Sequence, residues 1–190
     1  MADWLAAAPE TLRQALLEQI AAEIRETSAT TGCYELSETV RQALMAVPRH
    51  RFVSDERQEW AYANIPLPIG RGQTISQPFI VALMTGLLLP DPAATVLEIV
   101  TGSGYQAAVL AGLVRQVYSI ERIPELARTA AQRLRDMNID NVAIRVGDGG
   151  QGWKEHAPFD GIIVTATAPN IPPALVQQLK PGGRLVTPVG

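Results

Sequence analysis

The spacing of apolar residues predicts that the first third of the chain is helical. A first amphipathic helix over residues 9–26 is indicated by apolar side chains at helical spacing between polar ones, namely Leu12, Leu16, Ile20 and Ile24. Ser37 is a suitable N-cap for a second helix, which Pro48 ends. We therefore expect an N-terminal helical cap.

Residues 62–78 contain too many helix breakers for a helix interior: Pro66, Pro68, Gly70, Gly72 and Pro78. An ordered loop and a disordered linker are both compatible with these breakers. The segment also contains Ile65, Leu67, Ile69 and Ile75. Linkers are usually less apolar than this, so we favour the ordered loop. From Pro78 a further helix is expected to run to about Leu88.

From residue 95 onward, short runs rich in β-branched residues alternate with helical segments. They predict strands over residues 95–99, 116–120, 142–146, 159–165 and 184–189, and helices near 105–114, 124–137 and 172–179. Such alternation is typical of an α/β fold with a doubly wound, mostly parallel sheet. We expect residues 1–78 to form the helical cap and a loop beside the ligand site. Residues 79–190 are expected to form the α/β domain, packed with the cap as one compact unit.

Composition and charge exclude several classes of function. The chain has 190 residues, 47% of them hydrophobic and 18% charged, which is enough for one sizeable core. A formal net charge of −3 without a run of like charge predicts no binding to nucleic acid or to an anionic membrane. No apolar run is long enough to span a bilayer, and a single cysteine fits a reducing compartment. We therefore expect a soluble, cytoplasmic protein with no metal site of zinc-ligand spacing.

A glycine-rich turn follows the first strand of the α/β segment. Gly102, Ser103 and Gly104 precede a predicted helix, where small residues let backbone approach a ligand and the helix start offers unpaired amides. The pattern through Ala107 fits the G-x-G-x-x-A fingerprint of dinucleotide-binding proteins. Glu121 ends the following strand, where a carboxylate can accept from ribose hydroxyls. The spacing predicts an adenosine-containing cofactor, and NAD is one candidate.

Acidic residues around this turn favour a cationic cofactor without phosphate. Glu98 lies just before the turn, where it would repel a diphosphate and suit a cation. Asp148, between two glycines, ends the third strand near the expected adenine and can accept from its exocyclic amine. The turn contains no arginine or lysine to balance a phosphate. S-adenosylmethionine has a sulfonium, an ammonium, a ribose and an adenine but no phosphate, so it fits better than NAD.

Several longer motifs resemble those of protein-L-isoaspartate O-methyltransferases in order and spacing. They are Pro48–Val53, Leu67–Pro78, Leu97–Gln106, Gly147–Gly149 and Lys180–Val186, within residues 37–190. The run Thr74-Ile75-Ser76-Gln77-Pro78, a few residues after Leu67-Pro68-Ile69-Gly70, is the most particular to this family. The resemblance implies a Rossmann-like methyltransferase fold.

The resemblance also implies a reaction and its residues. A methyl group passes from S-adenosylmethionine to the free carboxylate of L-isoaspartyl residues in damaged proteins and peptides, which is a protein-repair reaction. Ser76 is implied as the catalytic residue that hydrogen-bonds this carboxylate, with Thr74 and Ile75 binding the substrate. The implied cofactor-binding residues are Glu98, Thr101, Gly102, Ser103, Gly104, Glu121, Asp148 and Gly149. A carboxylate is already an anion, so the reaction needs alignment and water exclusion rather than a general base or a metal.

Two features depart from the family. Val100 stands where the family's turn has its first glycine, and a β-branched residue does not easily take a positive φ, so we expect weakened cofactor binding. The sequence ends at Gly190 after the fifth predicted strand, whereas family members continue through further strands. We therefore expect a C-terminally short sheet that self-associates or pairs with a partner through an exposed edge. These departures leave open an alternative, a catalytically degenerate relative that serves as a binding module.

Overall fold

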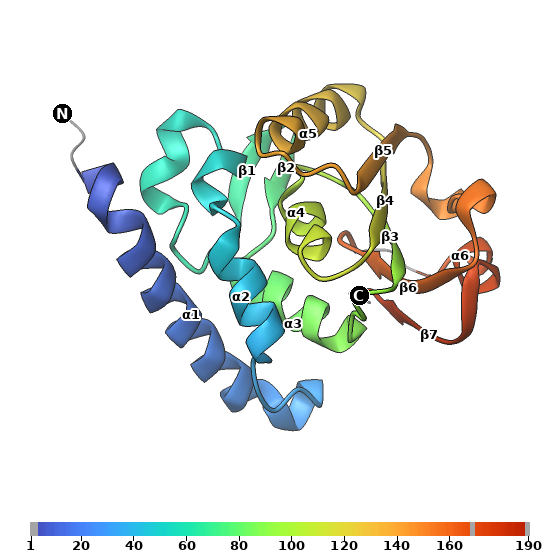
Figure 1. Cartoon of the computed structure of the whole chain (residues 1–190), viewed down its shortest axis with the longest axis horizontal. Helices are drawn as coiled ribbons and strands as arrows, with labels where there is room; N and C mark the ends of the chain where they lie inside the picture. Colours follow the sequence, from blue (N-terminus) through green and yellow to red (C-terminus); the bar gives the residue numbers. More distant parts are fainter. Residues whose placement is uncertain (1–3, 168–169, 189–190) are drawn as a thin grey trace.

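Helices and strands occupy most of the chain (Figure 1). The computed structural model describes residues 4–167 and 170–188. The helices are α1 (Trp4–Thr31), α2 (Glu38–Ala46), α3 (Pro78–Leu88), α4 (Tyr105–Ala111), α5 (Pro124–Asp136) and α6 (Pro173–Gln177), with short 3₁₀ helices η1 (Arg49–Phe52), η2 (Asp55–Trp60), η3 (Gly149–Gln151) and η4 (Lys154–His156). The strands are β1 (Leu67–Gly70), β2 (Gln73–Ile75), β3 (Thr95–Ile99), β4 (Gln116–Glu121), β5 (Val142–Val146), β6 (Phe159–Val164) and β7 (Leu179–Val186). No helix among the described residues has the length and apolar character that crossing a membrane requires.

Helix α1 extends beyond the predicted range of 9–26 at both ends. Past Glu26, hydroxyl groups donate to carbonyl oxygens one turn earlier: Thr27 Oγ1 to Glu23 O at 2.7 Å, and Thr31 Oγ1 to Thr27 O at 3.1 Å. Such bonds satisfy the hydroxyls without leaving the helix. The helix ends at Thr31, and the following Gly32 has a φ of +69°, which glycine adopts at little cost.

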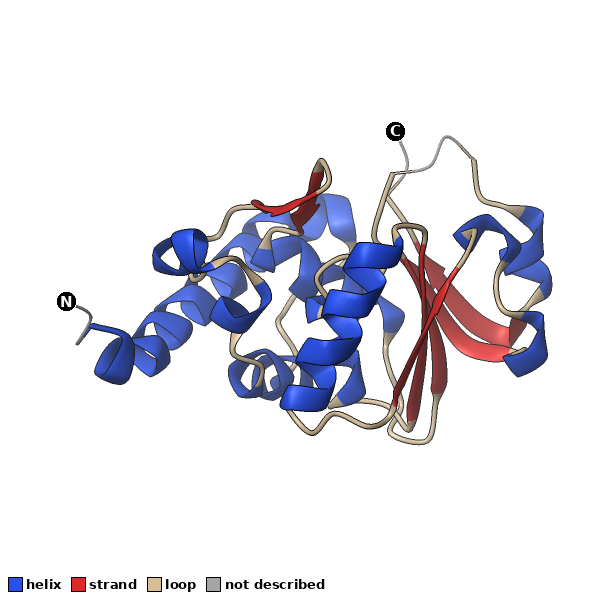
Figure 2. Ribbon diagram, turned by 90° about the horizontal axis from the view of Figure 1, so that it is seen from above, coloured by secondary structure: helices blue, strands red, loops and turns tan. Residues whose placement is uncertain are grey.

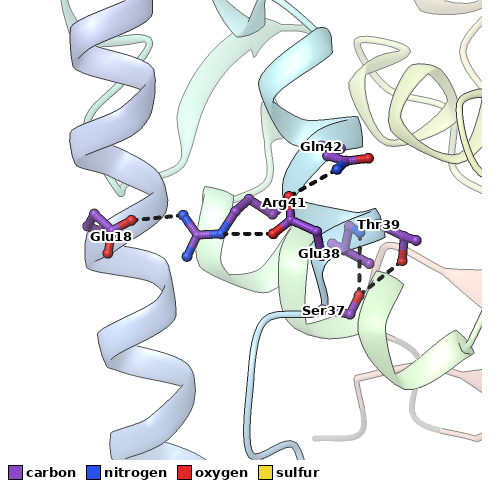
Figure 3. A network of polar contacts seen from close by, with 7 residues as sticks. Glu18, Ser37, Glu38, Thr39, Arg41 and Gln42 are labelled. Atoms are coloured by element: carbon purple, nitrogen blue, oxygen red, sulfur yellow. Dashed lines mark hydrogen bonds and ion pairs between the residues drawn. The ribbon is translucent and has the colours of Figure 1, made fainter.

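The predicted N-cap of α2 is confirmed, because Ser37 Oγ accepts a hydrogen bond from Val40 N at 3.4 Å. Figure 3 shows Arg41 of α2 between two carboxylates, with Nη1 2.9 Å from Glu18 Oε1 of α1 and Nε 4.0 Å from Glu38 Oε2. Exposed ion pairs of this kind contribute at most about 1 kcal/mol. The two helices are therefore held together mainly by their buried apolar faces, which include Ile20, Ile24, Val40 and Leu44.

Residues 62–78 form the expected ordered segment, and it contains an antiparallel hairpin that the sequence did not predict. Strand β1 pairs with β2, with Leu67 opposite Ile75. Three successive residues with positive φ reverse the chain, namely Gly70, Arg71 and Gly72. The breakers predicted only an ordered loop, because strands of four and three residues are too short to show an alternating pattern.

Asn64 anchors the segment at the start of α3. Its Oδ1 accepts from Phe79 N at 2.9 Å, and its Nδ2 donates to Glu23 Oε2 of α1 at 2.6 Å. The side chain thus satisfies one of the unpaired amides of the α3 N-terminus from a distance. The hairpin is in this way held between the helical cap and α3.

A parallel sheet with strand order β5-β4-β3-β6-β7 forms the other half of the described structure. Helices lie on both of its faces (Figure 2). On one face Val96, Val117 and Ile163 pack with side chains of α3 and α4, and on the other Leu97, Ile120 and Ile162 pack with Leu175 of α6. The predicted doubly wound parallel α/β fold is confirmed. The N-terminal cap and the α/β unit share a core. In it the rings of Phe52 and Tyr105 pack edge to face, with their centroids 5.4 Å apart.

The last strand departs most from prediction. It was expected over 184–189, but β7 begins at Leu179 and ends at Val186, and the end of the predicted range lies outside the described residues. Strand β7 contains Pro181, Gly182 and Gly183, and its pairing with β6 is irregular between Phe159 and Gly161. An ion pair supports this region, with Lys180 Nζ 2.6 Å from Asp160 Oδ1.

Candidate active site

Two neighbouring cavities open at the carboxyl edge of the sheet. The first, which we call the hairpin cavity, has a volume of about 260 Å³ and lies between β2 and the turn after β3. Figure 2 shows the hairpin at the end of the molecule toward which the strands run. No charged side chain is among its lining residues, which are Gly72, Gln73, Thr74, Ile75, Ser76, Val81, Val100, Thr101, Gly102, Ser103, Tyr105, Gln106, Thr165, Ala166 and Thr167.

The second, which we call the edge cavity, has a volume of about 490 Å³ and lies over the ends of β3, β4 and β6. Its walls are mostly apolar, including Ile99, Ile120 and Leu175, and its charged lining residues are Arg122 and Asp148. Val100, Ala166 and Thr167 line both cavities. Val100 therefore stands at the junction between them.

Val100 takes a positive φ of +74°. The left-handed region is unfavourable for a β-branched residue and costs of order 1–3 kcal/mol. Hydrogen bonds on both sides hold it there: Val100 N donates to Ile120 O at 2.8 Å, and Thr165 Oγ1 donates to Val100 O at 2.7 Å. The glycine-type backbone of this turn is thus kept although a valine occupies it.

Glu121 stabilises the same turn from the end of β4. Its Oε2 accepts from Gly102 N at 2.8 Å and its Oε1 from Ile123 N at 2.9 Å. The side chain is almost fully buried and lines neither cavity. Its observed contacts are with backbone amides, and they fix the position of Gly102.

Comparison with known proteins places the chain in a family. The family described as "Protein-L-isoaspartate(D-aspartate) O-methyltransferase (PCMT)" matches residues 6–190. The chain is 57% identical over 178 residues to protein-L-isoaspartate O-methyltransferase 2 of Syntrophobacter fumaroxidans, covering 94% of this chain and 72% of that protein. It is 56% identical to protein-L-isoaspartate O-methyltransferase 2 of Polaromonas sp. over 92% of this chain and 83% of that protein.

The chain belongs to the protein-L-isoaspartate O-methyltransferase family. A solved structure called protein-L-isoaspartate O-methyltransferase has the same fold, with a TM-score of 0.81 and 29% identity. The match covers 93% of this chain, and the chain spans 55% of the length of that structure. The cofactor is S-adenosylmethionine and the reaction class is methyl transfer, so the predicted family, fold and cofactor are confirmed. NAD and the binding-module alternative find no support in these relatives.

The methyltransferase residues implied by resemblance fall into three groups. Those that line the hairpin cavity are Thr74, Ile75, Ser76, Thr101, Gly102 and Ser103. Asp148 and Gly149 line the edge cavity. Glu98, Gly104 and Glu121 line neither cavity.

Ser76 lies just before α3, on the wall of the hairpin cavity. A serine this close to a helix start could serve as its N-cap, but Gln77 occupies the N-cap position of α3 and Asn64 satisfies the amide of Phe79. Among the described residues, the Ser76 hydroxyl has no hydrogen-bond partner. It is therefore available to a molecule in the cavity.

Gly149 marks a close approach in the edge cavity. A Cβ atom at this position would lie 2.3 Å from Ile99 Cγ2, so a larger residue would displace the Ile99 side chain. The adjacent Asp148 Oδ1 accepts from Gly150 N at 2.9 Å, which fixes its carboxylate beside the cavity.

Glu98 is fully buried beneath the turn. Its Oε2 accepts from Ser119 Oγ, which also lies 2.6 Å from Thr101 Oγ1, while its Oε1 has no partner among the described residues. Burial raises the pKa of Glu98 to about 8, the Ser119 hydrogen bond lowers it and the nearby Glu121 carboxylate raises it. The contacts of this carboxyl group are thus beneath the turn rather than in a cavity.

The raised pKa of Glu98 predicts a pH-dependent stability. Between about 4.5 and about 8 the folded chain retains a proton that the unfolded chain releases, so the free energy of unfolding falls as pH rises through this window. In Glu98→Gln this decrease should disappear, leaving the variant more stable than the parent at pH 9. Urea denaturation at several pH values measures it. An unchanged pH profile in the variant would contradict the buried, protonated state.

Several cavity residues were not predicted. Thr165, Ala166 and Thr167 follow β6, and Arg122 follows β4. Their position after a predicted parallel strand was a usable signal, because ligands bind outside the carboxyl ends of such strands. Gln106 gave no signal, since it lies within a predicted helix, where a buried amide cannot be told from an exposed one.

Proposed function

We propose that this chain methylates the free carboxylate of L-isoaspartyl residues in damaged proteins and peptides, with S-adenosylmethionine held across the two cavities. The observation that carries the proposal is the pair of cavities that meet at Val100, at the carboxyl edge of the sheet. An adenosine unit fits the apolar edge cavity with Asp148 and Gly149, and the methionine end fits the uncharged hairpin cavity with Gly102 and Ser103. Glu121 then supports the ribose region through the turn.

The residues of the hairpin cavity align and shield the reacting groups. When bound, S-adenosylmethionine supplies an electrophilic methyl group. Ser76 donates a hydrogen bond to one oxygen of the isoaspartyl carboxylate and directs the other toward the methyl carbon. Thr74 and Ile75 hold the substrate against the cavity wall. Because the isoaspartyl carboxylate is already an anion, methyl transfer to it would require no proton transfer, so no residue of the cavity is needed as a general base.

The Ser76 role is tested by methyl transfer to a synthetic isoaspartyl peptide. Ser76→Ala should lower kcat by about tenfold to a hundredfold, because a hydrogen bond to a charged group contributes about 1.5–3 kcal/mol. The dissociation constant of S-adenosylhomocysteine should stay within about twofold of the parent value, since this serine is assigned to the substrate. Gln73→Ala, which changes another residue of the same wall, is the matched control. Equal kcat values for parent and Ser76→Ala would remove the serine from the mechanism.

Partners and location follow from the proposed function. The partners are proteins and peptides that carry L-isoaspartyl residues, and the cytoplasm is the proposed site of action. The absence of nucleic-acid binding and the self-association through a sheet edge stay predictions. Strand β7 is at the edge of the sheet within the described residues, and sedimentation at high concentration measures any such pairing.

A further inference from the structure

Gln106 is a buried amide on the wall of the hairpin cavity to which the proposed reaction assigns no role. It lies in the first turn of α4 and is 7% exposed. Its Nε2 donates to Thr85 Oγ1 of α3 at 2.9 Å. A polar side chain this deeply buried is normally hydrogen-bonded at every group that it can satisfy.

The Thr85 hydroxyl fixes which end of the amide faces the cavity. Thr85 Oγ1 donates its single hydrogen to Val81 O at 2.7 Å, one turn earlier in α3. It can therefore only accept from Gln106, which assigns Nε2 to this contact and leaves Oε1 on the opposite side of the amide group. The orientation of the Gln106 amide is thus determined by the fold.

Gln106 Oε1 remains an unused acceptor. It has no partner among the described residues. Within the described residues, the side-chain atoms that are fully buried and have no hydrogen-bond partner belong to Arg13, Arg49, Glu98 and Arg145. Gln106 Oε1 is not among them, so this unpartnered atom is accessible from open space. The open space that Gln106 lines is the hairpin cavity.

The composition of the hairpin cavity indicates what Gln106 Oε1 could bind. Its lining contains no carboxylate, and Glu98 is withdrawn beneath the turn. An N–H group brought into an uncharged, buried site needs a neutral acceptor in a fixed position, because an unpaired donor costs about 1–3 kcal/mol. Gln106 Oε1 is such an acceptor, and its orientation is set before any ligand arrives.

We infer that Gln106 Oε1 accepts a hydrogen bond from an N–H group of the ligand in the hairpin cavity, and that Thr85 is the positioning residue that aims it. The inference rests on the proposed function of this cavity. Two ligands carry such a group there: the amino group at the methionine end of the cofactor, and the backbone amide of the isoaspartyl peptide. Gln106 Oε1 could accept from either group, and binding measurements distinguish the cofactor from the peptide.

The test is Gln106→Leu, measured with two nucleosides and one peptide. S-adenosylhomocysteine carries the amino group, whereas 5′-methylthioadenosine lacks the amino-acid end. If the cofactor is the donor, the variant should bind S-adenosylhomocysteine about tenfold more weakly and 5′-methylthioadenosine unchanged. If the peptide is the donor, KM for an isoaspartyl peptide should rise about tenfold with both nucleosides unchanged. Either result supports the inference.

Thr85→Val and Thr85→Ser separate aiming from packing. Thr85→Val keeps Gln106 and the volume of the Thr85 side chain, but it removes the hydroxyl that holds the Gln106 amide. It should therefore raise, by about threefold, whichever constant Gln106→Leu raises: the dissociation constant of S-adenosylhomocysteine or KM for the isoaspartyl peptide. Thr85→Ser retains the hydroxyl and should restore the parent value. The matched control is Gln178→Leu, a buried amide outside both cavities whose Oε1 accepts from Trp153 N at 2.6 Å; it should lower stability without changing either affinity.

A folded Gln106→Leu protein with unchanged affinities and KM would overturn the inference, and so would equal losses for both nucleosides, which indicate general damage. Each variant is also made in the Val100→Gly background, so that weak parent binding does not hide the effect. If neither background binds nucleoside or peptide, the proposed function fails and the inference fails with it. If the parent binds these ligands and Gln106→Leu binds them equally well, the inference is rejected and the proposed function is unaffected.

Discussion

Replacing Val100 by glycine should tighten the binding of S-adenosylhomocysteine by about tenfold or more. The side chain stands where the hairpin and edge cavities meet, so a cofactor that spans both must pass it. Valine at a φ of +74° is also strained, and the surrounding hydrogen bonds have to hold it there. Glycine removes the obstacle and the strain together. Calorimetric titration of parent and variant measures the change.

Stability should respond much less than affinity to this replacement. The strain relieved is of order 1–3 kcal/mol, but glycine costs roughly 0.5–1 kcal/mol in backbone entropy, and the buried part of the valine side chain is lost. Val100→Ala, which keeps Cβ, should give an intermediate affinity. Leu89→Gly is the matched control, because Leu89 also has a positive φ, of +48°, but lines neither cavity. It should leave affinity unaltered. A parent-like dissociation constant in Val100→Gly would show that Val100 does not limit cofactor binding.

Glu121→Gln should lower the free energy of unfolding by about 2–4 kcal/mol and weaken S-adenosylhomocysteine binding in parallel. The carboxylate accepts from Gly102 N at 2.8 Å and from Ile123 N at 2.9 Å. A glutamine has one accepting oxygen, so its NH₂ group would face one of these two amides, donor against donor. The unpaired amide then destabilises the turn that contacts the cofactor.

Glu125→Gln is the matched control for Glu121→Gln. Glu125 lies nearby in the sequence, but its carboxylate is 46% exposed and pairs with Arg71 at 3.3 Å. An exposed pair contributes at most about 1 kcal/mol, so this change should be close to neutral. Urea denaturation of the three proteins gives the comparison. If Glu121→Gln lowers the free energy of unfolding no more than Glu125→Gln does, the two amide contacts do not stabilise the turn.

Local signals in the sequence predicted much of the fold. The N-cap at Ser37 and the helix from Pro78 depend on residues within one turn of each other, so spacing alone was sufficient. Strand β3 was predicted with the bounds that the structure shows, because its short, mostly apolar run lies between turns. The β1–β2 hairpin was missed because packing against a distant part of the chain stabilises it. Ile69 of β1 lies against Gly102 in the turn after β3, with its Cδ1 3.6 Å from where a Cβ of Gly102 would be.

The candidate site was predictable as a location but not as a set of contacts. The carboxyl edge of a parallel sheet identifies Ser103 and Asp148 as neighbours of a ligand without any structure. The direction of a buried carboxylate depends on partners from other strands. Glu98 is bonded to Ser119, so neither its withdrawal from the cavity nor its raised pKa could be derived from its own neighbourhood in the sequence. The resemblance put Val100 at a glycine position of the family's turn, and the structure gives this residue a positive φ.

Methyl transfer to a matched pair of peptides would show directly whether this chain methylates L-isoaspartyl residues. The two peptides share one sequence and differ only in whether one residue is L-isoaspartate or L-aspartate, and the methyl group of S-adenosylmethionine is isotopically labelled. We expect label in the isoaspartyl peptide and none above background in the aspartyl peptide, with a higher rate in Val100→Gly. No label in either peptide, from parent and variant alike, or equal labelling of both, would contradict the proposed methylation of L-isoaspartyl residues.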